Sequence, residues 1–176
     1  MKIEIKKLIL VFLLGVAAGI LSFVLLSQNM AAVTVQTIFS PENGDEIIAF
    51  IDSARTSIDI EMYVFTSNEI LQALKRASDR GVTIRIILEK RVINSDNERI
   101  FNELKINGID VKWASQDYRL THAKFIIVDD KAVLVGSHNF SNSAMRENRE
   151  ASVIIRAEKI VNEFKEIFEE DWIRAK

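Results

Sequence analysis

The chain has 176 residues, a formal net charge of -2 and no cysteine. This length suits one domain plus an appendage, and the lack of cysteine excludes a disulfide framework and thiolate chemistry. The small negative charge gives no overall basic excess of the kind that indicates nucleic-acid binding.

The chain begins with an apolar run that can span a membrane. Residues 8–26 carry no charge, and a helix of this length, at about 1.5 Å per residue, nearly matches the hydrocarbon core of a bilayer. Three lysines precede the run, and no charged residue follows it until Glu42. The positive-inside rule therefore places the N-terminus in the cytoplasm and everything after Ser27 outside.

A cleaved signal peptide is the alternative to an uncleaved anchor. The apolar region of a signal peptide is usually shorter, and the positions around residues 29–32 are poor small-x-small cleavage sites. We expect residues 1–30 to be a membrane anchor, with a signal segment as the alternative. The predicted location is the cell membrane, crossed once, with an extracytoplasmic catalytic domain that is secreted if the segment is cleaved.

A tether and an edge strand are predicted over residues 31–44, and the catalytic domain is predicted to cover residues 45–176. The chain's only proline, Pro41, lies near this boundary together with Asn43 and Gly44. Such residues favour turns, so they mark the start of the folded domain.

A strand–helix–strand unit follows the first helix of this domain, for which Asp45 is a plausible N-cap. Residues 57–65 alternate between apolar and other side chains, which predicts a strand. A helix starts at Asn68 and ends at Gly81, and residues 82–88 form the next strand. A unit of this kind is right-handed, so its two strands should be parallel.

The second half of the domain continues the same pattern. Helices are predicted over residues 97–106 and 158–174, and strands over residues 109–113, 123–128, 132–135 and 150–156. The last helix carries aromatic residues on one face, and we expect this face to pack on the sheet. Together the elements predict an α/β fold, in which a mixed, largely parallel sheet is flanked by helices and preceded by an N-terminal transmembrane helix.

Candidate functional groups surround the strand that begins after His122. His122 and Lys124 share one side of this strand, because successive side chains point to opposite faces. A polar loop with Gly136, Ser137 and Asn139 follows the next strand and could fold back beside His122. This arrangement gathers an imidazole, a positive charge, a hydroxyl and an amide at one end of a sheet.

These groups fit the hydrolysis of a phosphodiester, which needs a nucleophile, an acid for the departing oxygen and donors for a charged transition state. His122 is the only credible nucleophile or base, because its imidazole can attack phosphorus. Lys124 would place a charge on a non-bridging oxygen, and Ser137 with Asn139 would add neutral donors. A serine hydrolase is disfavoured, because Ser137 lacks a Gly-x-Ser-x-Gly elbow.

The spacing of this motif resembles the signature of the phospholipase D superfamily, which is His-x-Lys, four residues, Asp, six residues and Gly-Ser-x-Asn. The positions that carry it are His122, Lys124, Asp129, Gly136, Ser137 and Asn139. A likeness to the small one-motif branch, which includes bacterial endonucleases and the mitochondrial cardiolipin hydrolase, extends to Tyr63, Phe65, Thr66 and residues 148–150. The resemblance covers residues 37–172.

The resemblance implies a mechanism with two histidines. One forms a phosphohistidine, and the other protonates the leaving group before it activates water. Because the chain has a single motif, two chains must combine, and we expect a homodimer with both motifs at its twofold axis. His138 is a poor substitute for the second histidine, and we expect it on the surface or behind the site.

The resemblance also assigns roles to two carboxylates. The implied catalytic set is His122, Lys124, Asp129 and Glu150. Glu150 would orient His122, whereas Asp129 would tie the hairpin turn to its surroundings, and the sequence alone does not separate these two roles. The family implies no metal or cofactor, and two histidines without cysteine make a poor zinc site, although carboxylates could bind another metal.

The sequence thus predicts a metal-independent phosphodiesterase of phospholipase D type and leaves its substrate open. The membrane anchor and the net negative charge favour phospholipid head groups, which is our main hypothesis. The one-motif, single-domain build favours nucleic acid, so a membrane-anchored endonuclease that cleaves DNA or RNA is the alternative. A third alternative is a non-catalytic anchored module that binds phosphate groups.

Overall fold

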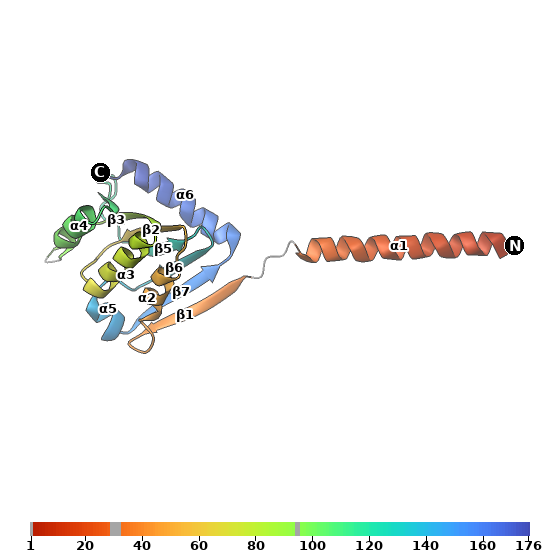
Figure 1. Cartoon of the computed structure of the whole chain (residues 1–176), viewed down its shortest axis with the longest axis horizontal. Coiled ribbons are helices and arrows are strands. Elements are labelled where there is room, and N and C mark those ends of the chain that lie inside the picture. Colours follow the sequence, from red (N-terminus) through yellow and green to blue (C-terminus); the bar gives the residue numbers. More distant parts are fainter. Residues whose placement is uncertain (1, 29–32, 94–95) are drawn as a thin grey trace. The chain divides into compact units, whose positions relative to one another are not determined.

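The computed structural model describes residues 2–28, 33–93 and 96–176. The chain divides into two compact units, Met1–Ala32 and Val33–Lys176 (Figure 1). The first two residues of the predicted tether, and the positions 29–32 that were weighed as cleavage sites, lie outside the described residues.

The first unit contains helix α1 (Lys2–Gln28). Its segment Glu4–Ser22 has a mean hydropathy of 2.1, and none of this segment is buried. Among the described residues, α1 is the one helix that is long and apolar enough to cross a membrane, and a signal sequence would meet the same criterion. An N-terminal apolar helix is therefore present, as the sequence predicts.

The second unit is built on one mixed sheet of seven strands, in the order β1-β7-β6-β5-β2-β3-β4. The strands are β1 (Thr34–Ser40), β2 (Ser57–Met62), β3 (Thr83–Leu88), β4 (Asp110–Trp113), β5 (Lys124–Val128), β6 (Ala132–Gly136) and β7 (Glu150–Arg156). As predicted, β2 and β3 are parallel, and β4 is parallel to β3. The other four pairings within the described residues are antiparallel.

The expectation of a largely parallel sheet was therefore wrong. It extended the first strand–helix–strand unit to the whole domain, but parallel neighbours need a crossover of a dozen or more residues. Three residues join β5 to β6, and the two turn residues Asp129 and Asp130 have φ angles of 55° and 52°. Aspartate tolerates this left-handed conformation, which reverses the chain into a hairpin.

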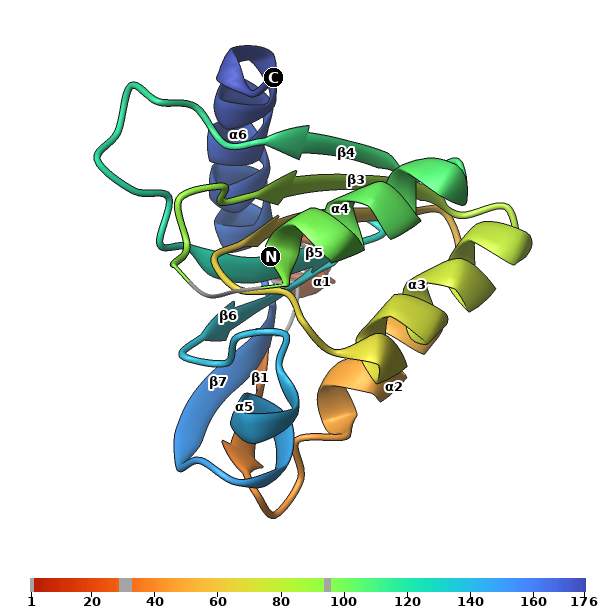
Figure 2. The same ribbon diagram turned by 90° about the vertical axis from the view of Figure 1, so that its left-hand side faces the viewer.

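Helices cover both faces of the sheet. They are α2 (Glu46–Asp52), α3 (Asn68–Asp79), α4 (Asn97–Ile106), α5 (Asn142–Arg146) and α6 (Glu158–Arg174). Figure 2 shows α2, α3 and α4 on one face and α6 on the other. The short helix α5 was not predicted, and it starts at Ser141, whose hydroxyl accepts a hydrogen bond from the backbone N–H of Ala144. Asp45 precedes α2, but its carboxylate binds Arg146 and makes no cap hydrogen bond.

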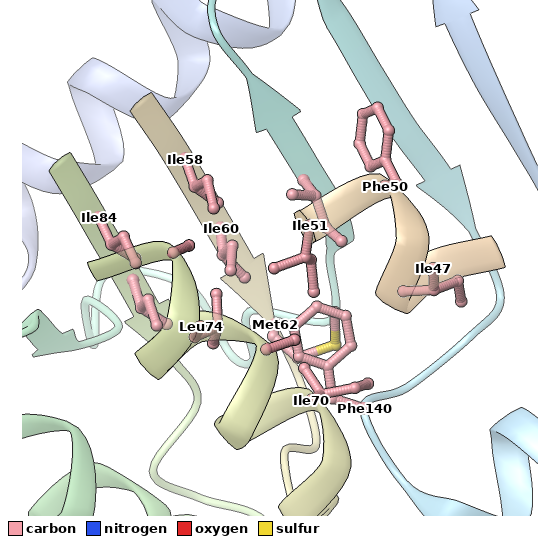
Figure 3. Close-up of a cluster of buried hydrophobic side chains, with 14 of the residues drawn as sticks. Ile47, Phe50, Ile51, Ile58, Ile60, Met62, Ile70, Leu74, Ile84 and Phe140 are labelled. Carbon is pink, nitrogen blue, oxygen red and sulfur yellow. The ribbon is translucent and has the colours of Figure 1, made fainter. Parts of the chain in front are cut away.

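Two hydrophobic clusters hold these layers together. The larger one fills the space between the sheet and α2 and α3, where Ile60, Met62 and Leu74 are fully or almost fully buried (Figure 3). The smaller one lies under α6 and includes Phe125 and Phe168. The aromatic face of α6 therefore packs on the sheet, as the sequence predicts.

One end of the sheet, called the site end below, collects the predicted functional positions. The strands β2, β3, β4 and β6 finish there, while β5 and β7 begin there, and the arrowheads of β3 and β4 mark this end in Figure 2. In the register, Met62 pairs with Lys124 and Ser40 pairs with Glu150. The opposite end, called the far end, carries Thr34, the first residue of β1.

Charged side chains are buried under α6 beside the smaller cluster. Asp59 on β2 binds Arg85 at 2.8 Å and Lys165 at 2.6 Å. Glu61, two residues further along β2, is only 4% exposed, and its Oε2 has no hydrogen-bond partner among the described residues. Burial raises the pKa of Glu61 to about 7, and the nearby carboxylate of Asp171 adds to the rise.

We expect the free energy of unfolding of unit Val33–Lys176 to fall as the pH rises from about 4.5 to about 7, because Glu61 is protonated in the folded state when it has already ionised in the unfolded state. This shift in the pKa of Glu61 corresponds to a loss of about 3 kcal/mol in the free energy of unfolding. Glu61→Gln should flatten this dependence. Urea denaturation at about pH 5 and about pH 8 measures the free energy of unfolding. An equal change with pH in the wild type and in Glu61→Gln would contradict the prediction.

Candidate active site

The site end brings His122 and Lys124 together with an aromatic ring. The Lys124 ammonium lies 3.3 and 3.4 Å from the two ring nitrogens of His122, and it donates a hydrogen bond to the backbone oxygen of His122 at 3.0 Å. The ring of Tyr63 lies 4.4 Å from that of His122, and the ammonium lies 5.3 Å from the Tyr63 ring centre. His122 remains exposed, so its imidazole can reach a substrate.

The charge of Lys124 is held in a partly buried position. Burial lowers the pKa of Lys124, and the carboxylate of Glu150 partly opposes that shift. An ammonium beside an imidazole is suited to an anionic ligand, because a phosphate oxygen can replace the water that the ammonium loses on burial. The arrangement therefore suits His122 to act as a nucleophile while the Lys124 ammonium binds a phosphate oxygen beside it.

Ser137 and Glu150 are joined at the same end of the sheet. The Ser137 hydroxyl donates to Glu150 Oε2 at 2.5 Å and accepts from the N–H of Ala151 at 3.0 Å. The amide of Asn148 donates to the other oxygen of Glu150 at 3.1 Å. These hydrogen bonds of Glu150 lie within one chain, and its orientation of His122 stays a prediction.

Asn139 carries an unused acceptor. Its Oδ1 is buried, and the described residues offer it no hydrogen-bond partner. A buried amide oxygen without a donor is destabilising by about 1–3 kcal/mol, and the exchange of O and N in the amide would present a donor in its place. The described residues thus leave one polar atom of Asn139 unsatisfied.

Asp129 lies at the far end of the sheet, away from the other predicted residues. It follows Val128, which pairs with Ile58 near the beginning of β2. Its carboxylate accepts hydrogen bonds from the backbone N–H groups of Arg55, Thr56 and Ser57 and from the Thr56 hydroxyl. These contacts tie the hairpin turn to its surroundings, which is the role that the resemblance implied for Asp129, and its position at the far end does not support a part in catalysis.

Burial acts to raise the pKa of Asp129, but these hydrogen bonds outweigh it and the pKa is lowered overall. We expect Asp129→Ala to lower the free energy of unfolding by about 2 kcal/mol near neutral pH, because three N–H groups lose their acceptor. Activity per folded molecule should not change. This stability is lost as the pH falls through the lowered pKa. Urea denaturation and turnover assays measure the two quantities, and a loss of turnover without a loss of stability would contradict the structural role.

Glu89 is a contributor that the sequence analysis did not identify. It is fully buried just beyond β3, and it accepts hydrogen bonds from the N–H of Thr121 at 2.7 Å and from Arg91. Arg91 in turn donates to the backbone oxygens of Ser115 and Tyr118. The pair thus holds the loop that leads into His122, and an acid directly after an apolar strand was the only signal in the sequence.

His138 is buried, so the expectation of a surface position was wrong and a position behind the site is correct. Its Nε2 lies 2.6 Å from the Ser40 hydroxyl, and its Nδ1 lies 2.7 Å from the Ser152 hydroxyl. The described residues contain no group of three or more His, Cys, Asp or Glu side chains that could hold a metal ion.

Comparisons with known proteins agree with this geometry. A family profile described as "Cardiolipin synthase, PLD-like domain" matches residues 47–172. The chain is 33% identical over 120 residues to the mitochondrial cardiolipin hydrolase of Canis lupus familiaris, with coverage of 68% of this chain and 46% of that protein. It is 33% identical over 144 residues to a phospholipase D of Rickettsia conorii, with coverage of 81% and 69%. The chain thus spans about half the length of the first of these relatives.

Among solved structures, the chain resembles Nuc from Salmonella typhimurium, described as a phospholipase D family member. The TM-score is 0.77 at 32% sequence identity, and the match covers 82% of this chain and 97% of Nuc. NucT from Helicobacter pylori has a similar fold, with a TM-score of 0.73 at 23% identity.

Proposed function

Since the chain belongs to the family of phospholipase D-like domains, we propose that it hydrolyses phosphodiester bonds through His122. The observation that supports this most directly is the exposed imidazole beside the partly buried Lys124 ammonium at the site end. A histidine nitrogen attacks phosphorus, and the bond from phosphorus to the departing oxygen breaks as a phosphohistidine forms. Water then releases the phosphate group and restores the histidine.

Lys124 and the polar loop would stabilise the phosphate during both steps. The ammonium offers a fixed positive charge, Ser137 a hydroxyl and Asn139 an amide. Glu150, whose carboxylate accepts a hydrogen bond from Ser137, would orient a catalytic histidine. None of these roles requires a metal ion.

The departing oxygen needs a proton, and we propose that it comes from His122 of a second copy. An apolar groove beside the site supports a homodimer. Its cavity of about 320 Å³ lies between α6 and the sheet and is lined by Ala123, Lys124, Phe125, Val135, Glu163, Phe164 and Ile167. A second hollow of about 270 Å³ shares Val135 and reaches Phe39, which is exposed. A twofold partner on this surface would bring a second motif to Lys124.

Mixed dimers test this proposal. Wild-type and His122→Asn chains with different tags are co-expressed in equal amounts. The turnover of this mixture is compared with that of a wild-type sample that contains the same total amount of chain. If one site needs both histidines, only wild-type pairs work and activity falls to about a quarter, whereas independent chains would keep about half. A value near one half would overturn the shared site.

We propose phospholipid head groups as the substrate. The names of the relatives, a mitochondrial cardiolipin hydrolase and a phospholipase D, support this choice, as does the apolar helix α1. An endonuclease is the second candidate, because the match to Nuc covers 97% of that chain. Both substrates carry the phosphodiester that the site would attack.

A side-by-side assay separates these candidates. Unit Val33–Lys176 contains both hydrophobic clusters, so it can be tested without α1, and the full chain in detergent is tested beside it. Each is given phospholipid vesicles, single-stranded DNA and RNA in the presence of a chelator, with His122→Asn as the control. Release of head group that the control lacks would support the phospholipase, and cleavage of nucleic acid alone would support the nuclease.

We also propose that α1 anchors the chain in the cell membrane with the N-terminus in the cytoplasm. The chain has no cysteine, so a Lys159→Cys substitution at an exposed position of α6 gives a single site for labelling. A membrane-impermeant maleimide should label it in intact cells. Labelling only after lysis would contradict an extracytoplasmic domain.

A further inference from the structure

His138 occupies a closed polar position between the two proposed phosphate donors. It is 2% exposed, whereas Ser137 before it is exposed and Asn139 after it is partly exposed. The two ring nitrogens of His138 are both engaged, one with Ser40 and the other with Ser152. The imidazole therefore lies behind the loop, whereas Ser137 and Asn139 on either side of it are more exposed.

The hydrogen bonds fix where the imidazole proton lies. The Ser40 hydroxyl donates its one proton to the backbone oxygen of Ala144 at 2.5 Å, so it must accept from Nε2 of His138. With its proton on Nε2, a neutral imidazole has a lone pair on Nδ1, and this nitrogen accepts from the Ser152 hydroxyl. For a neutral imidazole, these contacts thus specify the tautomer with its proton on Nε2.

Burial favours the same neutral state. It lowers the pKa of His138, and the carboxylate of Glu150 only partly opposes the shift. A buried histidine with both nitrogens occupied cannot pass a proton to a substrate. His138 is therefore unable to serve as the second histidine of the mechanism, which leaves that role to a partner chain.

The two hydrogen-bond partners of His138, and the Ala144 oxygen that accepts from the first of them, belong to different elements. Ser40 ends β1, Ala144 lies in α5 and Ser152 lies on β7. The loop is also fixed on either side, because the Ser137 N–H donates to Ala151 and the Phe140 N–H donates to Val64. Between these two backbone contacts, the buried imidazole ties the loop to Ser40 and Ser152.

We propose that His138 is a positioning residue that aims Ser137 and Asn139 at the substrate phosphate, a role that rests on the proposed function. Its neutral imidazole holds the loop against β1 and β7, and the Ser40 hydroxyl continues this chain of hydrogen bonds to α5. Without it, the loop keeps its two backbone contacts, but the hydroxyl and the amide lose their alignment. The consequence is weaker binding of phosphate and slower turnover in a protein that is still folded.

The test compares His138→Leu with His138→Gln in the full chain in detergent. Leucine fills the space without hydrogen bonds, whereas glutamine offers an N–H to Ser40 and an oxygen to Ser152. We expect His138→Leu to weaken the binding of inorganic phosphate, measured by calorimetry, and to lower kcat, each by about tenfold, because the loop loses both hydrogen bonds of the imidazole. His138→Gln should restore most of both.

Further variants separate positioning from folding. Ser152→Ala removes one hydrogen bond of His138 and should cause a smaller loss of the same kind, while Ser53→Ala, which affects a hydroxyl bound to Phe50 in α2, should change neither quantity. If His138→Leu does not fold, His138→Gln and Ser152→Ala decide the result.

Normal phosphate affinity and kcat in folded His138→Leu would overturn the proposal. So would a His138→Gln protein that regains thermal stability but not phosphate affinity. Phosphate affinity is measured without turnover, so its loss would still be seen if the wild-type chain hydrolysed none of the substrates and the proposed function failed.

Discussion

Replacing His122 with asparagine is expected to lower turnover by about 10⁴-fold or more and to leave the fold intact. Asparagine has no nucleophilic ring nitrogen, so no phosphohistidine can form. The ring contributes little to stability, because it is exposed and its contacts are with Tyr63 and Lys124. Hydrolysis of a chromogenic phosphodiester measures turnover, and thermal denaturation measures stability.

The same variant decides between an enzyme and a phosphate-binding module. An enzyme loses turnover in His122→Asn while its melting temperature stays close to that of the wild type. A variant that retains more than about one tenth of wild-type turnover would contradict the nucleophilic role of His122. A wild-type chain that binds phosphate without any turnover would point to the non-catalytic module instead.

Lys124→Met is expected to lower kcat about a hundredfold or more. Methionine keeps most of the apolar stem but removes the ammonium, which lies 3.3–3.4 Å from both ring nitrogens of His122. A phosphate bound to His122 would carry its developing charge in that position, and the loss of one such electrostatic group costs about 3 kcal/mol of transition-state stabilisation. Steady-state kinetics on the chromogenic diester measure the effect.

A matched control separates the local charge from the overall charge. Lys131→Met makes the same chemical change at an exposed lysine beside the hairpin turn at the far end. It should change kcat by less than about twofold, because solvent and salt screen charges beyond about 10 Å. A kcat for Lys124→Met within about threefold of the wild type would show that the ammonium does not stabilise the transition state.

Strong periodicity made several elements predictable. The bounds of α4, β7 and α6 equal the predicted ranges 97–106, 150–156 and 158–174. Strand direction was less accessible, because it depends on which connections are long enough for a crossover. Helix α5 is only five residues long, and its Ser141 cap is recognisable only beside its neighbours in space.

The candidate site was predictable where one strand determines it. His122 and Lys124 share a strand start, so their proximity followed from local geometry. The same reasoning could have moved Asp129 away, because five residues of strand at about 3.3 Å each place it about 17 Å from Lys124. The contacts of Glu89 and His138 could not be predicted, since their partners come from distant parts of the sequence.

The direction of β1 determines how a membrane-bound chain can use its site. β1 runs from Thr34 at the far end to Ser40 at the site end, and six steps of about 3.3 Å make this about 20 Å. If α1 anchors the chain as we propose, the anchor is thus connected to the end of β1 that lies away from His122. A lipid of the anchoring bilayer would then be hydrolysed only if the site end also came to that surface, whereas a substrate in solution or on another membrane would not impose this condition.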